Sequence, residues 1–461
     1  MRFAVAAKYS SELQESRFDM VKLAFLSCAF FLVICAYTLT QGLKDSVFMG
    51  VVGKEYVPWA KTFSMLVLVP AILFYSSLVD NVRRYQLLIF YSLFFGVTGL
   101  LFTYYIGHPV IGLSNTDTSK WRIFGWLFFF YSEGVSPFVV SVFWAFVNSM
   151  SSPLFAKKHY GSMVAASKIG GMVGAAFAWL LFTWSARAVS PYFTDIVTHQ
   201  IVVGVSAVVF LLIPFVIWGL MRFVPEVHLH GYEAVYQAEK DQSRQAKPGL
   251  FSGLYLLLRY PYVLGIFGMV FFYEVAITIL SYLRLEVAQD NAHSVSEISA
   301  YFFKMVFAIH LVGFFISFIG TTSLLKLIGT KWCLLLIPVL SGACLFYVIF
   351  ASSGSGIIFA YIALKAIHYA FSWPVRESLY IPTTKEIKFK SKSWIDAFGG
   401  KFAKTTGSAF NIIATQIAGG AIISTLHMGF FLVIVVSWFI STILLGKRFE
   451  KAVAQQEVIG S

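Results

Sequence analysis

The sequence has 461 residues, of which 58% are apolar and only 12% are charged. A soluble domain carries about 25% charged residues, so this composition excludes a soluble enzyme. Lys and Arg outnumber Asp and Glu by 35 to 22, which gives a formal net charge of +13. In a soluble protein this excess would suggest a nucleic-acid partner. In a membrane protein its meaning depends on where the charges lie along the chain.

Twelve stretches are long and apolar enough to cross a bilayer as helices, which requires roughly 20 mostly apolar residues. We therefore expect an all-α integral membrane protein with twelve transmembrane helices. In chain order the stretches lie near residues 22–43, 57–79, 85–107, 122–150, 161–185, 199–222, 258–282, 299–325, 332–351, 354–378, 398–425 and 427–446.

The basic residues are distributed unevenly between the two ends of these spans. With a cytoplasmic N-terminus, 23 of the 35 Lys and Arg residues fall in termini or loops on the cytoplasmic side. Six fall in loops on the opposite side, among them Lys44 and Arg284, and the other six lie within spans. The positive-inside rule then predicts that both termini are cytoplasmic, which requires an even number of spans.

A polar stretch divides the chain into two groups of six spans that resemble repeats. Lys61 and Lys304 lie early in the second and eighth spans, and Lys168 and Lys404 lie early in the fifth and eleventh. A parallel 6+6 pseudo-repeat is the plan of major-facilitator-type transporters, which hold the substrate between their halves. The expected parts are an N-terminal six-helix bundle (1–222), a cytoplasmic linker (223–257), a C-terminal six-helix bundle (258–446) and a cytoplasmic tail (447–461).

Charged residues within spans normally face a cavity or a partner, because a Lys at the centre of a spanning helix costs about 2.5–3.5 kcal/mol. Their positive surplus predicts an anionic cargo such as a phosphate compound, whose oxygens accept hydrogen bonds from several ammonium groups. Snorkelling of the lysines near span ends and purely structural ion pairs remain alternatives. The candidates are Lys61, Lys168, Lys304, Lys365, Lys404, Glu133 and Glu274.

Other features favour structural roles. Two histidines within spans, His310 and His368, suit either a proton relay or hydrogen-bonded packing.

The four cysteines lie in apolar runs, and no metal-binding spacing occurs, so no metal or cofactor is expected. Without a Walker A motif, energy must come from gradients or exchange. Small residues recur every four positions in the fifth span, which predicts close helix packing at Ala166, Gly170, Gly174 and Ala178.

The segment from Trp373 to Ser408 carries the most specific motif of the chain. It resembles the pattern D-P-T-K-E-x-x-Y-I-P-x-x-E-E-x-K-x-K-x-K-x-x-x-D-x-x-G-x-R-x-G-K-S-G-G of the ADP/ATP translocase family of intracellular bacteria and plant plastids. Arg376 and Lys401 keep the charge that the family has at their positions. The matching residues are Pro374, Glu377, Tyr380, Ile381, Pro382, Glu386, Lys388, Lys390, Lys392, Asp396 and Lys404.

Three further segments extend the resemblance over most of the chain. Lys61-Thr62 followed by Pro70-Ala71 is similar to the family's K-T-W…L-P-S-A. The run from Glu133 to Asn148 resembles its fourth span, and residues 156–160 resemble its E-A-K-R-F-Y motif.

The resemblance implies a transporter that exchanges or imports nucleotides. The family's functional second-span lysine, fourth-span glutamate and eleventh-span lysine fall on Lys61, Glu133 and Lys404. Two positions depart from the pattern: Ser281 stands where the family's seventh span has a glutamate, and Lys168 replaces a usually neutral residue. Glu274, two turns before Ser281, is the candidate substitute for the missing acid.

We therefore expect a secondary transporter whose central cationic cavity carries nucleotides by alternating access, with ATP/ADP exchange as the leading cycle. Alternatives are proton-coupled nucleotide import, or transport of another phosphorylated compound or a carboxylate. An enzyme or scaffold on the same fold would instead give no flux into liposomes. The candidate substrate-binding residues are Lys61, Glu133, Asn148, Lys168, Glu274, Lys304, Lys365, Lys401 and Lys404.

The same features predict the oligomeric state, the membrane location and the partners of the protein. We expect a monomer that spans the bacterial inner membrane, or alternatively the plastid inner envelope, several times. Its partners would be the lipid bilayer and a small anionic substrate. No nucleic acid is needed to explain the net charge, because most of the excess lies in cytoplasmic loops.

Overall fold

The structure, a computed structural model, describes residues 2–79, 82–151, 153–187, 194–225, 229, 252–292, 294–319, 321–351, 353–384, 387, 391–417 and 420–460. Almost all of these residues are helical, and the β structure among them is an isolated bridge between Thr383 and Ile459. The predicted all-α fold is therefore confirmed. Hydrocarbon offers no water to backbone groups, and helices satisfy these groups internally.

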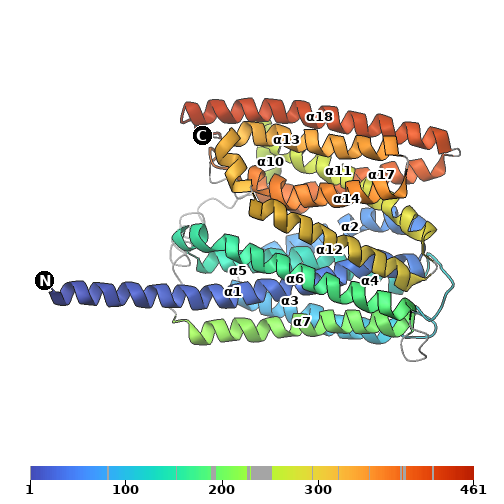
Figure 1. The fold of residues 1–461 in the computed structure, drawn as a ribbon, viewed down its shortest axis with the longest axis horizontal. Coiled ribbons are helices and arrows are strands. Elements are labelled where there is room, and N and C mark those ends of the chain that lie inside the picture. Colours follow the sequence, from blue (N-terminus) through green and yellow to red (C-terminus); the bar gives the residue numbers. More distant parts are fainter. Residues whose placement is uncertain are drawn as a thin grey trace.

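The first group of helices forms one side of the bundle, in the lower part of Figure 1, with α2 at its border. Its members are α1 (Arg2–Val51), η1 (Lys54–Tyr56), α2 (Val57–Val79), α3 (Arg84–Ile106), α4 (Ile123–Val135), η2 (Ser136–Val140), α5 (Ser141–Met150), α6 (Pro153–Arg187) and α7 (Asp195–Phe223).

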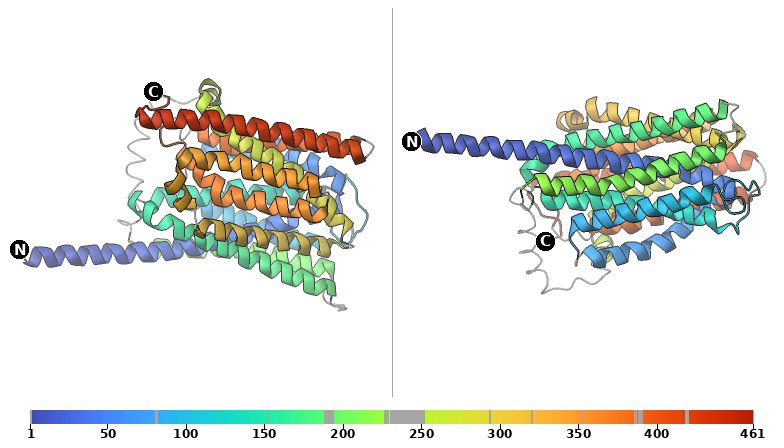
Figure 2. Two further views of the ribbon diagram at one scale, coloured as in Figure 1. Left: turned by 45° about the horizontal axis from the view of Figure 1, so that its top comes forward. Right: turned by 90° about the horizontal axis from the view of Figure 1, so that it is seen from below.

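The second group forms the other side, and both termini lie at the same end of the bundle (Figures 1 and 2). Most of the predicted linker lies outside the described residues, so the division into domains stays a prediction. The members of the second group are α10 (Ser252–Arg259), α11 (Pro261–Asp290), α12 (Val295–Ile319), α13 (Thr321–Ala351), α14 (Gly354–Ile367), η3 (His368–Ser372), α15 (Trp373–Ser378), α16 (Lys392–Trp394), η5 (Ile395–Gly399), α17 (Gly400–Gln416) and α18 (Gly420–Ala454).

Ten helices within the described residues are long and apolar enough to cross a membrane. The second and eleventh predicted spans coincide with α2 and α17, which are not among these ten, and α17 has only 17 residues. A multi-pass membrane protein is confirmed, whereas the count of twelve and the cytoplasmic placement of the termini stay predictions.

Two helices continue beyond the ends that hydropathy predicted for them. α1 runs to Val51 and α11 to Asp290, so Lys44 and Arg284 lie within helices. Their assignment to loops was wrong. A stretch of 20 residues is only the minimum for a crossing, and longer helices can tilt or extend past the hydrocarbon. Both side chains are buried, with 8% and 4% exposure.

The loop expected between the eighth and ninth spans is instead marked by a break inside α13. Lys326 and Lys331, which were expected in that loop, flank Gly329, whose φ is +78°. Glycine adopts this left-handed conformation without a Cβ penalty, so it ends one helical segment and begins the next. The break separates a short helical segment from the ninth span.

The small-residue stripe of α6 packs against α1, as predicted. A Cβ on Gly170 would collide with the carbonyl oxygen of Phe31, and one on Gly174 would lie 3.1 Å from the carbonyl oxygen of Cys35. Such close approach gains dispersion energy between helices where lipid removes the hydrophobic drive for association.

One face of α12 joins the second group of helices to the first. Ser299 Oγ lies 2.8 Å from Ser46 Oγ on α1, and the rings of Phe303 and Phe182 stack with centroids 5.9 Å apart. Further along, Phe307 contacts Trp179 on α6, and His310 Nε2 lies 3.4 Å from Thr38 Oγ1. Spacings of three and four residues place these side chains on one helix face.

The outer surface of the bundle is apolar. Phe90, Phe215, Trp218 and Phe350 are 56%, 69%, 65% and 83% exposed. An apolar groove of about 370 Å³ between α2 and α4 is lined by Phe63 and Trp126, among others. In water such a surface would drive association, and in a membrane it faces lipid tails.

The α1–α6 contact gives a direct test of the packing. Gly170→Ala should lower the unfolding temperature, because overpacking against a backbone carbonyl costs about 1–3 kcal/mol and exceeds the helical advantage of Ala. Gly161→Ala is the matched control in the same helix, since nothing lies within 4 Å of its added methyl. Thermal unfolding of both variants in detergent decides the matter, and equal unfolding temperatures would contradict the packing described.

Candidate functional site

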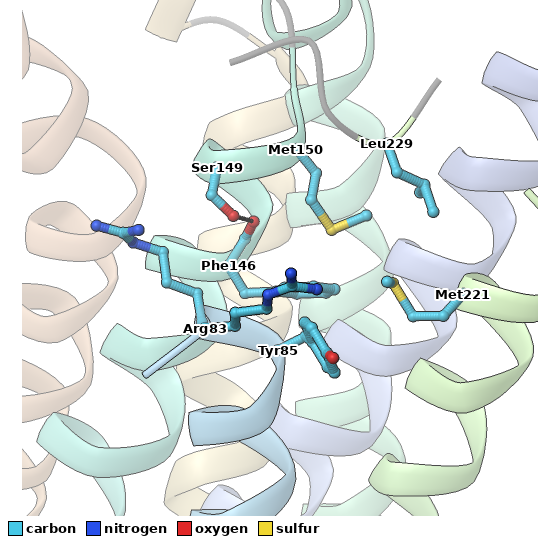
Figure 3. Close-up of a pocket in the computed structure, with 8 residues that line it drawn as sticks. Arg83, Tyr85, Phe146, Ser149, Met150, Met221 and Leu229 are labelled. Carbon is cyan, nitrogen blue, oxygen red and sulfur yellow. Dashed lines mark hydrogen bonds between the residues drawn. The ribbon is translucent and has the colours of Figure 1, made fainter. Parts of the chain in front are cut away.

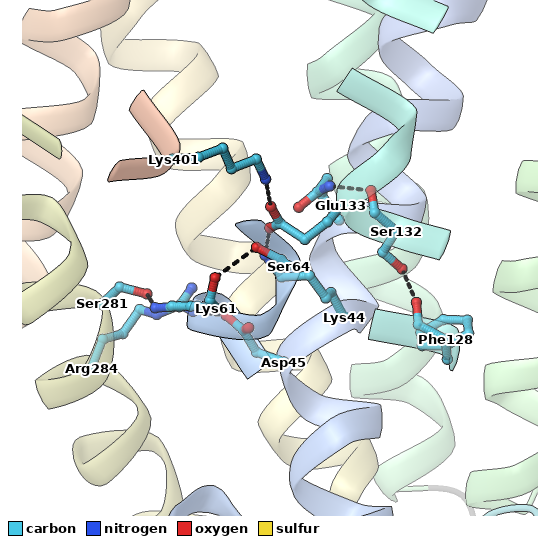
Figure 4. A network of polar contacts seen from close by, with 11 residues as sticks. Lys44, Asp45, Lys61, Ser64, Phe128, Ser132, Glu133, Ser281, Arg284 and Lys401 are labelled. Atoms are coloured by element: carbon cyan, nitrogen blue, oxygen red, sulfur yellow. Dashed lines mark hydrogen bonds and ion pairs between the residues drawn. The ribbon is translucent and has the colours of Figure 1, made fainter. Parts of the chain in front are cut away.

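Six charged side chains from five helices meet in the interior of the bundle, and we call them the central cluster (Figure 4). Their helices belong to both groups, so the cluster lies where the two sides of the bundle meet. The members are Lys44 and Asp45 on α1, Lys61 on α2, Glu133 on α4, Arg284 on α11 and Lys401 on α17.

Glu133 holds one lysine with each carboxylate oxygen. Lys44 Nζ lies 2.5 Å from Oε1, and Lys401 Nζ lies 2.6 Å from Oε2. The three side chains are only 10–11% exposed. Since Lys44 and Lys401 come from different groups of helices, the carboxylate connects the two sides. A buried carboxylate with two ammonium partners is compensated in charge, which removes most of the penalty for its desolvation.

A second ion pair also joins the two groups. Arg284 donates to Asp45 Oδ2 over 2.5 Å, and its guanidinium lies 4.2 Å from the ring centroid of Phe302 and 4.7 Å from that of Tyr361. Both rings contribute cation–π attraction. Within the described residues, Asp45 Oδ1 and Arg284 Nε have no hydrogen-bond partner.

Lys61 differs from its neighbours because its partner is neutral. Its ammonium group donates to Ser281 Oγ at 3.1 Å, and within the described part of the chain no carboxylate lies within 4 Å of it. Ser281 is the position at which the resemblance implied a glutamate. Asp45 is the acid that acts on Lys61 most strongly.

Two other predicted residues lie near tyrosines, outside the central cluster. Lys168 Nζ is 5.3 Å from the ring centroid of Tyr369, and Lys365 Nζ is 5.0 Å from that of Tyr361. Two more, Lys404 on α17 and Glu274 on α11, are half-buried. Glu274 is the charge that acts on Lys404 most strongly, and Glu133 of the central cluster acts on it as well.

The structure does not bring the last two predicted residues into contact with these groups. Lys304 is exposed on α12. Asn148 is also exposed, and its Oδ1 accepts a hydrogen bond of 2.7 Å from the hydroxyl of Tyr160. Both were selected from the sequence by the repeat or by the resemblance, which carry no information about the direction of a side chain.

Three π-helical segments adjoin the charged residues. η2 begins three residues after Glu133, η3 begins three residues after Lys365, and η5 ends two residues before Lys401. A π-helical turn inserts an extra residue, which widens the helix and rotates the side chains that follow. Such segments occur frequently at functional sites.

A small pocket lies apart from the central cluster, where α3 begins and α5 and α7 end (Figure 3). Arg83, Met150, Met221 and Leu229 are among the residues that line it, and its volume is about 20 Å³. This volume suits one water molecule. It is too small for a metabolite.

The sequence reasoning missed Lys44, Asp45 and Arg284. A signal was present, because buried apolar residues continue at helical spacing after each of these charges. They are Val47 and Val51 after Asp45, and Leu285 and Ala288 after Arg284.

Comparison with known families identifies the family of the chain. The model of the TLC ATP/ADP transporter family matches residues 14–449. The chain belongs to this family. A TLC family member is a transporter, so the expectation that the protein is not an enzyme is confirmed.

Curated relatives of this TLC family member are similar along nearly its whole length. The "ADP,ATP carrier protein 1" of Chlamydia trachomatis serovar D is 24% identical, over 95% of this chain and 90% of the relative. The "ADP,ATP carrier protein 1, chloroplastic" of Arabidopsis thaliana is 23% identical, over 95% of this chain and 75% of the relative.

Solved structures show the fold of this TLC family member. A D-xylose–proton symporter superimposes with a TM-score of 0.63 at 11% identity, covering 92% of this chain and 96% of its own. A bacterial homologue of the iron transporter ferroportin, in an inward-facing state, gives 0.62 at 9% identity, covering 91% and 99%. The predicted major-facilitator-type fold is confirmed.

The Asp45–Arg284 pair predicts a large effect of a small substitution. Asp45→Asn leaves the buried guanidinium uncompensated and should destabilise the protein by about 3–5 kcal/mol, visible as a lower unfolding temperature. Glu450→Gln is the control, because Glu450 forms an exposed pair with Lys331, and such pairs contribute roughly 0–1 kcal/mol. Equal unfolding temperatures for the two variants would show that the Asp45–Arg284 pair is not buried as described.

Proposed function

We propose that this TLC family member carries nucleotides across a membrane by secondary transport, with exchange of ATP and ADP as its cycle. Support comes from the family and from relatives that are named ADP,ATP carriers. The observation that carries the proposal is the central cluster, where four cations face two carboxylates between the two groups of helices. A surplus of buried positive charge is best compensated by a cargo with several negative charges.

The distribution of charge and contacts supports alternating access as the mechanism of the proposed transport. The two groups of helices, corresponding to residues 1–222 and 258–446, would rock against each other around the central cluster. Glu133 and Asp45 compensate the cations while the site is empty. An anion that competes for these cations weakens the links between the sides, so its binding shifts the balance between the two orientations.

Exchange and its alternatives place different requirements on the empty carrier and on the cargo. Without cargo the central cluster keeps four cations against two carboxylates. Exchange requires that the loaded form cross faster than the empty one, and an anion that compensates this surplus charge would have that effect. Proton-coupled import of nucleotides predicts uptake without internal nucleotide, and transport of another anion predicts competition by that anion.

Reconstituted protein distinguishes these cases. Proteoliposomes loaded with ADP should take up external labelled ATP, whereas empty vesicles should not, because exchange needs an internal partner. The measurement is the initial rate of ATP uptake by loaded and empty vesicles, with and without an imposed proton gradient.

Three outcomes contradict the proposal in different ways. Uptake into empty vesicles driven by the proton gradient would replace exchange with proton-coupled import. Inhibition by a phosphorylated metabolite or a carboxylate, but not by unlabelled ATP, would replace the nucleotide cargo. Folded protein that gives no flux with any of these anions would refute secondary transport itself.

A further inference from the structure

The buried and half-buried lysines of the interior fall into two classes that differ in their partners. Lys44 and Lys401 share the carboxylate of Glu133, and Lys404 lies under the influence of Glu274. Lys61, Lys168 and Lys365 have no carboxylate within 4 Å among the described residues. Lys61 donates to Ser281 Oγ, whereas Lys168 and Lys365 lie over aromatic rings. Both are half-buried.

The surroundings of these two lysines are aromatic. Lys168 lies over the ring of Tyr369 and Lys365 over that of Tyr361, at 5.3 Å and 5.0 Å from the centroids. Such contacts return roughly 0.5–2 kcal/mol each. This is less than the cost of removing an ammonium group from water without a counter-charge. Lys365 also forms a hydrogen bond with the hydroxyl of Tyr361. Lys168 has neither a carboxylate nor such a hydrogen bond among the described residues, so its charge is the less compensated of the two in the free protein.

Tyr369 shows that Lys168 and Lys365 share one neighbourhood. Lys168 Nζ lies 5.3 Å from the ring centroid of Tyr369, which follows Lys365 by four residues, and the ring of Tyr369 lies 5.4 Å from that of His368. His368 stacks flat on Tyr273 with centroids 3.6 Å apart, and the Nδ1 atoms of His310 and His368 are buried without a hydrogen-bond partner among the described residues. The neighbourhood thus offers two ammonium groups and two unused ring nitrogens.

The two lysines come from opposite sides of the bundle. Lys168 is on α6 in the first group of helices, and Lys365 is on α14 in the second. An anion bound by both would connect the sides as Glu133 does. A phosphate group suits this position, since its oxygens accept hydrogen bonds from several ammonium groups at once.

We propose that Lys168 and Lys365 form a subsite for part of the phosphate chain of the cargo, in addition to the cations of the central cluster, for which the cargo competes with Glu133 and Asp45. This inference rests on the proposed function and deepens it. Affinity should then increase with the number of phosphates, from adenosine through AMP and ADP to ATP. Inorganic pyrophosphate should bind to the same subsite, because recognition requires only the phosphates.

Single substitutions test the subsite on purified full-length protein. Lys168→Gln and Lys365→Gln should each weaken ATP binding about tenfold or more, since a hydrogen bond to a charged group contributes about 1.5–3 kcal/mol. Binding of adenosine should change little. Lys168→Arg, which keeps the charge, should restore most of the affinity, and Lys304→Gln is the matched control on an exposed lysine.

A second readout separates this role from a structural one. Removing the uncompensated charge in Lys168→Gln should raise the unfolding temperature of the ligand-free protein, whereas ATP should stabilise both Gln variants less than the wild type. A structural lysine would show a lower unfolding temperature without ligand.

The outcomes are distinct. Wild-type ATP affinity in both Gln variants, together with its loss in Lys401→Gln, would place the phosphates in the central cluster and overturn this inference while the nucleotide cargo stands. If neither ATP, ADP nor pyrophosphate stabilises the wild type, the proposed function fails first. Equal loss of ATP and adenosine binding in the Gln variants would show that the two lysines do not recognise the phosphate groups.

Discussion

The carboxylate of Glu133 is the point on which the arrangement of the interior depends. It is buried in α4 and requires positive partners, and it receives one from α1 and one from α17. Because these helices belong to different sides of the bundle, satisfying one charge also fixes how the sides meet. Asp45 and Arg284 repeat this principle across α1 and α11. Buried ion pairs of this kind add specificity of arrangement rather than much net stability.

Such links suit a carrier, because another anion can compete for them. The contacts along α12, from Ser299 to His310, close the seam between the sides through small and aromatic side chains. Packing of this kind forms or separates as a unit, whereas the ion pairs weaken when another anion binds to their cations. A cargo with several phosphates would weaken the ion pairs, and the contacts along α12 would then separate.

The sequence alone predicted most of the fold and part of the candidate site. Hydropathy predicted the helical membrane fold. The resemblance to nucleotide carriers led to Lys61, Glu133 and Lys404, of which the structure places the first two in the central cluster, together with Lys401. Lys44 and Arg284 were missed because they fall beyond a 20-residue window, although their helices continue. Asn148 and Lys304 were expected in the site but are exposed, since neither a repeat nor a motif specifies the direction of a side chain. Pairing between helices distant in sequence requires the fold itself.

The most direct test of the account is to lock the seam between the two sides. Ser46 and Ser299 are fully buried with their hydroxyl oxygens 2.8 Å apart, so Ser46→Cys together with Ser299→Cys should form a disulfide between α1 and α12. Nucleotide uptake by proteoliposomes should stop when this protein is oxidised and return after reduction, while each single Cys variant transports under both conditions. Transport at the wild-type rate with the disulfide formed would contradict alternating access between these two sides.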